Sequence, residues 1–165
     1  MYYHEQVRDL FTVNEGIKGE PYCLAHCISA DFGMFGGVVV GFNKNYNMKN
    51  RLVKTYGSGV KTFEKIGPFI LPEPSSLEGD CFPIFNLITK RKVQDKPTYQ
   101  DLRKTLDMMK KHMLSMGYTK LAIPKIGCGI DGLDWRIVSD MIQEVFEDTE
   151  IEILVCFIGV DNYGK

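Results

Sequence analysis

Two stretches of the chain carry apolar residues at the spacing of an amphipathic helix. The first opens at Pro97-Thr98-Tyr99, and its apolar positions are Leu102, Leu106, Met109 and Met113. Gly117 is a suitable residue to end this helix. The second is expected to begin at an Asp134 N-cap, and its apolar positions are Ile137, Val138, Met141, Ile142, Val145 and Phe146. Both stretches are therefore predicted to be helices that bury one face.

Apolar runs elsewhere in the chain predict strands. The runs cover residues 2–8, 22–29, 81–89, 121–124 and 151–158. A shorter run at residues 69–71 is expected to stop at Pro72 and Pro74. The run at residues 22–29 is nearly continuous, which is typical of a strand buried on both faces.

Residues 30–66 are the least regular part of the pattern. A helix is expected to begin within residues 38–42, although the β-branched triplet Val38-Val39-Val40 favours a strand. Residues 43–56 are predicted to be partly helical. Residues 56–65 are predicted to be a loop because they contain Gly57 and Gly59. The alternation of strands with helices predicts one three-layer α/β domain over residues 1–165.

Three loops that leave the ends of predicted strands carry the candidate chemistry. They are residues 31–37, 90–92 and 127–131, and we expect them to line one cleft, because α/β folds bind ligands beyond the carboxyl ends of their strands. In the third loop, Gly127, Gly129 and Gly132 allow positive φ and a close approach to a ligand. The helix that follows offers free N–H groups, so the loop suits a phosphate. Asp131 is an unexpected residue in a loop that only holds phosphate, and it is the first indication of chemistry.

Composition narrows the class of protein. The 165 residues are 44% hydrophobic and 25% charged, the range of an ordinary globular protein, and the net charge of −1 gives no overall basic field for nucleic acid. No apolar run reaches the length of a membrane span, and we expect no signal peptide at the N-terminus. The five cysteines lack the spacing of a disulfide scaffold and are expected to be reduced thiols. We therefore expect an intracellular protein, located in the cytoplasm or, if the source is a eukaryote, in the nucleus. We also expect it to be a monomer with no membrane partner.

Four short stretches resemble the macrodomain family. They are Ala25-His26-Cys27-Ile28-Ser29, Leu87-Ile88-Thr89-Lys90, Lys96-Pro97-Thr98-Tyr99 and Pro124-Lys125-Ile126-Gly127-Cys128-Gly129-Ile130-Asp131. Within that family the chain is most similar to the subfamily of terminal ADP-ribose protein glycohydrolase, over residues 7–155, and most other macrodomains lack the lysine of the second stretch. The resemblance implies a three-layer α/β/α fold with a central mixed sheet. It also implies ADP-ribose binding and removal of ADP-ribose from acidic side chains.

The resemblance implies functions for individual residues. Lys90 matches the catalytic lysine that attacks the anomeric carbon of the distal ribose, and Asp131 matches the carboxylate that assists and then resolves the adduct. Asp9, followed by Leu10, matches the aspartate that meets the adenine amino group, and Ser29 matches a residue that lines the distal ribose. The other matching positions, in the loops that hold the diphosphate and ribose, are Gly36, Gly37, Pro124, Ile126, Gly127, Cys128, Gly129 and Ile130.

Three features depart from the family pattern. Arg8 stands where glycine usually precedes the adenine aspartate, and Phe35 stands at a loop position usually filled by glycine. Residues 48–79 are longer than in the family and unlike it. These departures leave open the shape of the diphosphate loop and any substrate beyond ADP-ribose.

The candidate catalytic residues also have structural interpretations. Lys90 begins a Lys-Arg-Lys cluster of the kind that is usually solvated, and Asp131 could simply cap a turn. Cys128 is expected to be structural, because no histidine has the spacing to activate it as a nucleophile. Phe157 and Tyr163, near the C-terminus, are candidates for stacking on adenine.

Three nearby residues mimic a metal site. Cys23, His26 and Cys27 lie on one buried strand, so their side chains divide between the two faces of the sheet. We therefore expect no metal and no cofactor, and we interpret His26 as a core or pocket histidine.

Three classes of function compete. A hydrolase acting through Lys90 and Asp131 would release ADP-ribose from Glu/Asp esters, from O-acyl-ADP-ribose or, in a variant, from nucleic-acid bases. A reader module would bind ADP-ribose with the same loops, and a phosphatase would act on ADP-ribose 1″-phosphate. The hydrolase needs an unprotonated lysine as nucleophile and a group to take its proton. The presence of both Lys90 and Asp131 favours the hydrolase, since a reader needs neither.

Overall fold

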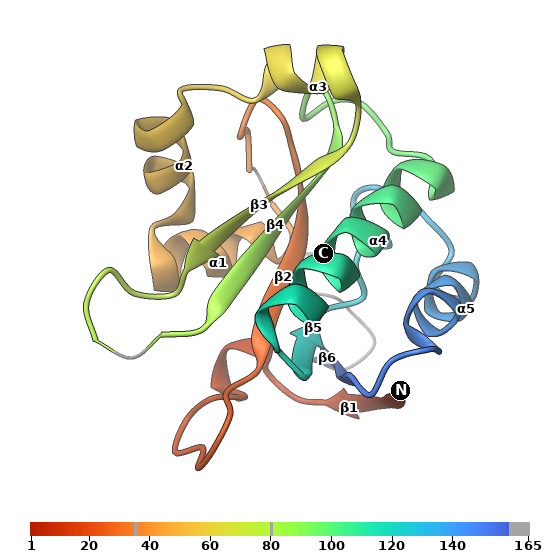
Figure 1. Ribbon diagram of the computed structural model, residues 1–165. Helices are drawn as coiled ribbons and strands as arrows, with labels where there is room; N and C mark the ends of the chain where they lie inside the picture. Colours follow the sequence, from red (N-terminus) through yellow and green to blue (C-terminus); the bar gives the residue numbers. More distant parts are fainter. Residues whose placement is uncertain (35, 80, 159–165) are drawn as a thin grey trace.

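A six-stranded sheet is the centre of the molecule. The computed structural model describes residues 1–34, 36–79 and 81–158, and within them the strand order is β1-β6-β5-β2-β4-β3 (Figure 1). The strands are β1 (Tyr2–Val7), β2 (Cys23–Ser29), β3 (Phe69–Pro74), β4 (Pro83–Lys90), β5 (Lys120–Ile123) and β6 (Glu152–Phe157). All neighbouring strands are parallel except β3 and β4, so the sheet is mixed.

Helices cover both faces of this sheet. On one face lie α4 (Tyr99–Met116) and α5 (Trp135–Phe146), and on the other lie α1 (Val39–Tyr46) and α2 (Met48–Tyr56) (Figure 1). The sheet therefore has two hydrophobic cores, one beneath α4 and α5 (the α4–α5 core) and one beneath α1 and α2 (the α1–α2 core). Because side chains alternate along a strand, Ile153 packs in the α4–α5 core and Leu154 packs in the α1–α2 core. The α3 helix (Val60–Ile66) follows α2, and a short 3-10 turn (Leu10–Thr12) follows β1. The predicted three-layer α/β/α fold is confirmed.

The two helices predicted from apolar periodicity are confirmed, and their ends have local causes. Thr98 and Asp101 form a reciprocal capping box at the start of α4, and Gly117 ends it with φ +77°. The Asp134 carboxylate accepts the Arg136 N–H at the start of α5. Ile137 is the exception on the predicted apolar face, since it is 47% exposed. None of the helices in the described ranges has the length and apolarity that a bilayer crossing requires.

Two sequence predictions between residues 56 and 74 are wrong. The prediction of a loop over residues 56–65 is wrong, because Gly57 is the C-cap of α2, Gly59 is the N-cap of α3, and the two glycines lie between these helices instead of breaking one. The strand at residues 69–71 was expected to stop at Pro72, but β3 continues to Pro74, opposite Pro83. Proline is tolerated there because β3 is an edge strand, where a missing N–H breaks no ladder on the open side.

Candidate active site

The loops that follow β2, β4 and β5 line one cleft. These strands are parallel neighbours, so their carboxyl ends lie at the same edge of the sheet. Most of the predicted site residues line the cleft: Ser29, Gly36, Gly37, Lys90, Pro124, Ile126, Gly127, Gly129, Ile130 and Asp131. The predicted convergence of the three loops is therefore confirmed for the described residues.

A lysine and an aspartate are paired inside this cleft. Lys90 Nζ donates to Asp131 Oδ1 across 2.7 Å, and the two side chains are only 8% and 14% exposed. Lys90 is the last residue of β4, so the sheet holds its backbone, while the glycine loop brings in Asp131. The next residue, Arg91, leaves the cleft and pairs with Glu64 on α3. Lys90 is therefore not part of a solvated basic cluster.

The loop between β5 and α5 turns at its glycines. Gly127 and Gly132 have φ of +74° and +78°. Leu133 N–H donates to the Gly127 carbonyl at 2.9 Å, which closes the loop on itself. Lys96 Nζ donates to the carbonyl of Ile130, the residue immediately before Asp131. The glycines and the Lys96 contact together fix the backbone that presents Asp131.

The loop after β2 is organised by a carboxylate that the sequence reasoning did not select. Asp31 accepts hydrogen bonds from Ser29 Oγ at 2.5 Å, from Gly33 N–H at 3.1 Å and from Val93 N–H at 3.2 Å. Partial burial raises the pKa of Asp31, but these hydrogen bonds outweigh burial, so its pKa lies below the ordinary value. Asp31 thus ties the first loop to the loop that follows Lys90. The local signal was Asp31-Phe32-Gly33, an aspartate that accepts a hydrogen bond two residues on.

The residues predicted for the adenine end do not line the cleft. The Asp9 carboxylate accepts the Phe11 N–H at 2.9 Å, and Leu10 is fully buried. Phe157 lies at the end of β6, with Lys125 Nζ 4.1 Å from its ring centroid. Contact of Asp9 and Phe157 with adenine stays a prediction, and Phe35 and Tyr163 lie outside the described residues.

The thiols of the site are not poised as nucleophiles. Cys128 was predicted among the residues of the ligand loop, but it does not line the cleft, and its Sγ donates to the Ile126 carbonyl at 3.2 Å. Burial raises the pKa of Cys128 to about 12. Burial, with a further contribution from Asp131, also raises the pKa of Cys27 well above its ordinary value. Both groups are thiols rather than thiolates near neutral pH, so Lys90 is the better nucleophile candidate.

His26 is a core residue, as predicted. Its Nε2 lies 2.6 Å from Asn86 Oδ1, and its ring stacks on Phe42 with centroids 3.8 Å apart. Burial lowers the pKa of His26 to about 4, so the ring is neutral near pH 7. Over the described ranges, no group of three His, Cys, Asp or Glu side chains is placed to hold a metal ion.

Comparison with known proteins gives the family. No protein-family model matches the chain. A human protein named ADP-ribose glycohydrolase OARD1 is 43% identical over 132 residues, which are 80% of this chain and 79% of the human protein. The macrodomain of Thermus aquaticus DarG has a similar structure, with a TM-score of 0.75 at 19% identity, over 95% of this chain and 98% of that chain. This chain belongs to the macrodomain family.

A second solved structure of similar fold contains bound ADP-ribose. Thermosipho africanus DarTG in complex with ADP-ribose matches with a TM-score of 0.64 at 20% identity, over 84% of this macrodomain and 38% of that chain. At this identity the match shows the shared fold alone. The resemblance of the sequence to the macrodomain glycohydrolases is confirmed by the human relative.

Proposed function

We propose that this macrodomain is an ADP-ribosyl hydrolase that binds ADP-ribose in the cleft and cleaves its linkage to acidic side chains through Lys90 and Asp131. The observation that carries the proposal is the 2.7 Å contact between these two side chains inside the glycine-lined cleft. The human relative, which bears the name ADP-ribose glycohydrolase, supports the same activity. The assignment of the two residues rests on the resemblance to the family's catalytic lysine and carboxylate and on the geometry of their contact.

The pair suits a nucleophilic mechanism. Asp131 Oδ1 accepts the hydrogen bond of Lys90 Nζ, so it is placed to take the proton that the ammonium must lose. The neutral amine then attacks the anomeric carbon of the distal ribose. The bond from this carbon to the ester oxygen breaks, and the side-chain carboxylate leaves. Asp131 then gives its proton to the ring oxygen and takes the second amine proton, so the sugar ring opens to a protonated imine on Lys90. Water hydrolyses the imine to free ADP-ribose and Lys90, with Asp131 as general acid and base.

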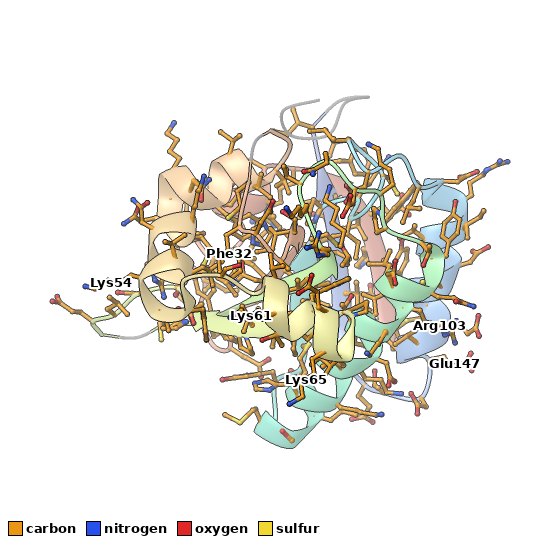
Figure 2. All side chains as sticks on the ribbon, turned by 90° about the horizontal axis from the view of Figure 1, so that it is seen from above. Phe32, Lys54, Lys61, Lys65, Arg103 and Glu147 are labelled. Carbon is orange, nitrogen blue, oxygen red and sulfur yellow. The ribbon has the colours of Figure 1, made fainter. Side chains whose placement is uncertain are left out.

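The substrate class follows from this chemistry. Glu and Asp esters share a carboxylate leaving group with O-acyl-ADP-ribose that is acylated on the anomeric oxygen, and this group needs no protonation to depart. ADP-ribosylated nucleic-acid bases are the second candidate. The observation in favour of them is the set of exposed lysines on α2 and α3, among which Lys54 and Lys65 project from the molecule (Figure 2). A reader module would bind ADP-ribose but would have no use for the buried pair.

The first experiment measures release of ADP-ribose from a glutamate-ADP-ribosylated protein. Lys90→Ala and Asp131→Ala are expected to lower the rate by roughly 10²–10⁴-fold. Lys90→Gln is a second variant, because an amide can still donate a hydrogen bond to Asp131 but cannot form the imine. Arg91→Ala is the matched control, since Arg91 pairs with Glu64 outside the cleft, and it is expected to keep the wild-type rate.

Two further readouts separate the alternatives. Borohydride reduction during turnover is expected to trap a covalent adduct on Lys90 in the wild type only. Thermal melts and ADP-ribose binding show whether each variant is folded. Full activity in folded Lys90→Gln would overturn the mechanism. Binding of ADP-ribose without release from protein would indicate a reader, or a hydrolase of another linkage if ADP-ribosylated DNA is cleaved.

A further inference from the structure

Lys125 occupies a distinctive position at the cleft. It lies just after β5, lines the cleft, and is half-buried. The register of the parallel strands pairs Ile123 with Val155, so two residues further on Lys125 lies opposite Phe157. The ammonium group rests on the Phe157 ring, 4.1 Å from the centroid.

The other lysines around the cleft are held by oxygen atoms. Lys90 donates to the Asp131 carboxylate, Lys96 to the Ile130 carbonyl and Lys49 to the Gly33 carbonyl. Lys125 instead contacts the face of an aromatic ring, a weaker partner than an anionic oxygen. Its ammonium can therefore exchange its partner for an anion at lower cost than the other three.

The chemistry of the proposed ligand supplies that anion. The diphosphate of ADP-ribose carries two negative charges, and the backbone N–H groups of a glycine loop donate hydrogen bonds but bring no full charge. The glycine loop begins at Gly127, two residues after Lys125. Lys90 is not available as a counter-ion, because its amine is needed as the nucleophile.

We propose that Lys125 is the cation that binds the diphosphate of ADP-ribose, and that it leaves the Phe157 ring when the ligand enters. The inference rests on the proposed function, since it takes ADP-ribose as the ligand. The movement also uncovers the face of Phe157, the ring that the sequence predicted to stack on adenine. Lys125 thus couples neutralisation of the diphosphate to the opening of a surface for the base.

Lys125→Gln tests the inference, and the chain offers a matched control. Lys120 Nζ lies 4.2 Å from the centroid of the Tyr22 ring, at the opposite end of β5 and away from the cleft. Lys125→Gln is expected to weaken ADP-ribose binding roughly ten-fold and to raise KM with little change in kcat. Lys125→Arg keeps the charge and should stay within about three-fold of wild type. Lys120→Gln removes the same charge and the same type of ring contact, and should leave binding unchanged.

Salt and NMR measurements sharpen the result. The affinity of wild type for ADP-ribose should fall with added salt more steeply than that of Lys125→Gln, because salt screens the charge pair. The side-chain protons of Lys125 should carry a ring-current shift in the free protein and lose it when ADP-ribose is added.

Three outcomes would overturn the inference. Equal ADP-ribose affinity and salt dependence in wild type and Lys125→Gln would remove Lys125 as the counter-ion and leave the proposed hydrolase untouched. An unchanged ring-current shift in the complex would contradict the movement. Absence of ADP-ribose binding by wild type itself would overturn the proposed function, and the inference with it.

Discussion

The two glycine-containing loops that line the cleft both contain residues with positive φ, but they accommodate these residues by different means. The loop between β5 and α5 takes positive φ at glycines, Gly127 and Gly132. The loop after β2 has positive φ not only at glycines but also at two residues with side chains, Phe32 and Met34, whose φ values are +56° and +53°. A side chain in this region costs about 1–2 kcal/mol per residue, which glycine avoids. The loop between β5 and α5 (the relaxed loop) therefore avoids this backbone strain, because glycines take the positive φ. The strain in the loop after β2 must be offset by contacts with its surroundings.

The surroundings of the loop after β2 supply two kinds of stabilisation. Phe32 is fully buried and Met34 nearly so, and Figure 2 shows Phe32 inside the molecule while Lys54 and Lys65 project outward. Burial of an aromatic or aliphatic side chain contributes roughly 1.5–3 kcal/mol, enough to offset the backbone cost. The three hydrogen bonds to Asp31 then fix the loop against its neighbour. The comparison teaches that two loops with positive φ can be destabilised by different kinds of substitution.

The largest effect is expected for Gly127→Ala in the relaxed loop. The new methyl group would take φ +74° and would lie 3.0 Å from Leu133 Cδ1 and 3.4 Å from Leu102 Cδ2. Strain and crowding together should lower the free energy of unfolding by about 2–4 kcal/mol and weaken ADP-ribose binding. Urea denaturation and calorimetric titration measure the two effects.

Gly129→Ala is the control for stability in the same loop. Gly129 does not have left-handed φ, and a methyl group there would meet no atom within 4 Å. Its free energy of unfolding should stay within about 1 kcal/mol of wild type. If the two alanine variants were equally stable, the loop would not depend on glycine geometry at residue 127.

Asp31→Asn is expected to have the second largest effect, and it breaks the other loop. An amide cannot accept all three hydrogen bonds as well as the carboxylate does, so we expect a loss of about 1–2 kcal/mol at pH 7. The pKa of Asp31 is lowered in the folded protein, although burial opposes the shift. Its stabilisation is therefore present above the unfolded pKa of ~3.9 and is lost as the pH falls through the folded value.

Urea denaturation at pH 7 and at pH 3 measures this difference. The gap in stability between wild type and Asp31→Asn should narrow at the lower pH. Asp95→Asn serves for comparison, because the exposed Asp95 accepts one hydrogen bond, from Lys92 N–H, and its loss should cost no more than about 0.5 kcal/mol. A gap that is the same at both pH values would mean that the ionised carboxylate of Asp31 contributes nothing.

The same contrast explains how much the sequence could predict. Periodicity and caps predicted α4 and α5, and the glycines marked the loop that presents Asp131. The resemblance to the macrodomain family supplied Lys90 as a nucleophile, which a Lys-Arg-Lys cluster alone does not indicate. Lys90 and Asp131 are 41 positions apart in the sequence. They come into contact because parallel strand pairing brings the end of β4 and the loop after β5, which carry them, to the same edge of the sheet.

What the sequence did not predict depends on partners distant in the chain. Asp31 matters because Val93, 62 positions away, donates to it. The α3 helix forms because Val60 and Phe63 pack against the α1–α2 core, which overrides the loop-like signal of Gly57 and Gly59. Such tertiary contacts leave no periodic pattern in the local sequence.

The smallest effect is expected for Lys96→Met, which tests whether the relaxed loop needs any side chain to hold Asp131. Lys96 is exposed and donates to the Ile130 carbonyl, so its loss should change the free energy of unfolding by less than about 0.5 kcal/mol. Without the hydrogen bond from Lys96, the Ile130 carbonyl is held less firmly, so Asp131 is less often in position for proton transfer. We therefore expect kcat to fall roughly three-fold and KM for the ADP-ribosylated substrate to stay nearly unchanged. Lys92→Met removes the same charge from the same segment without touching Ile130, and it should keep the wild-type kcat. If both variants lose activity equally, the effect belongs to the positive charge near the cleft rather than to the Lys96 contact, and the glycine loop positions Asp131 by its backbone alone.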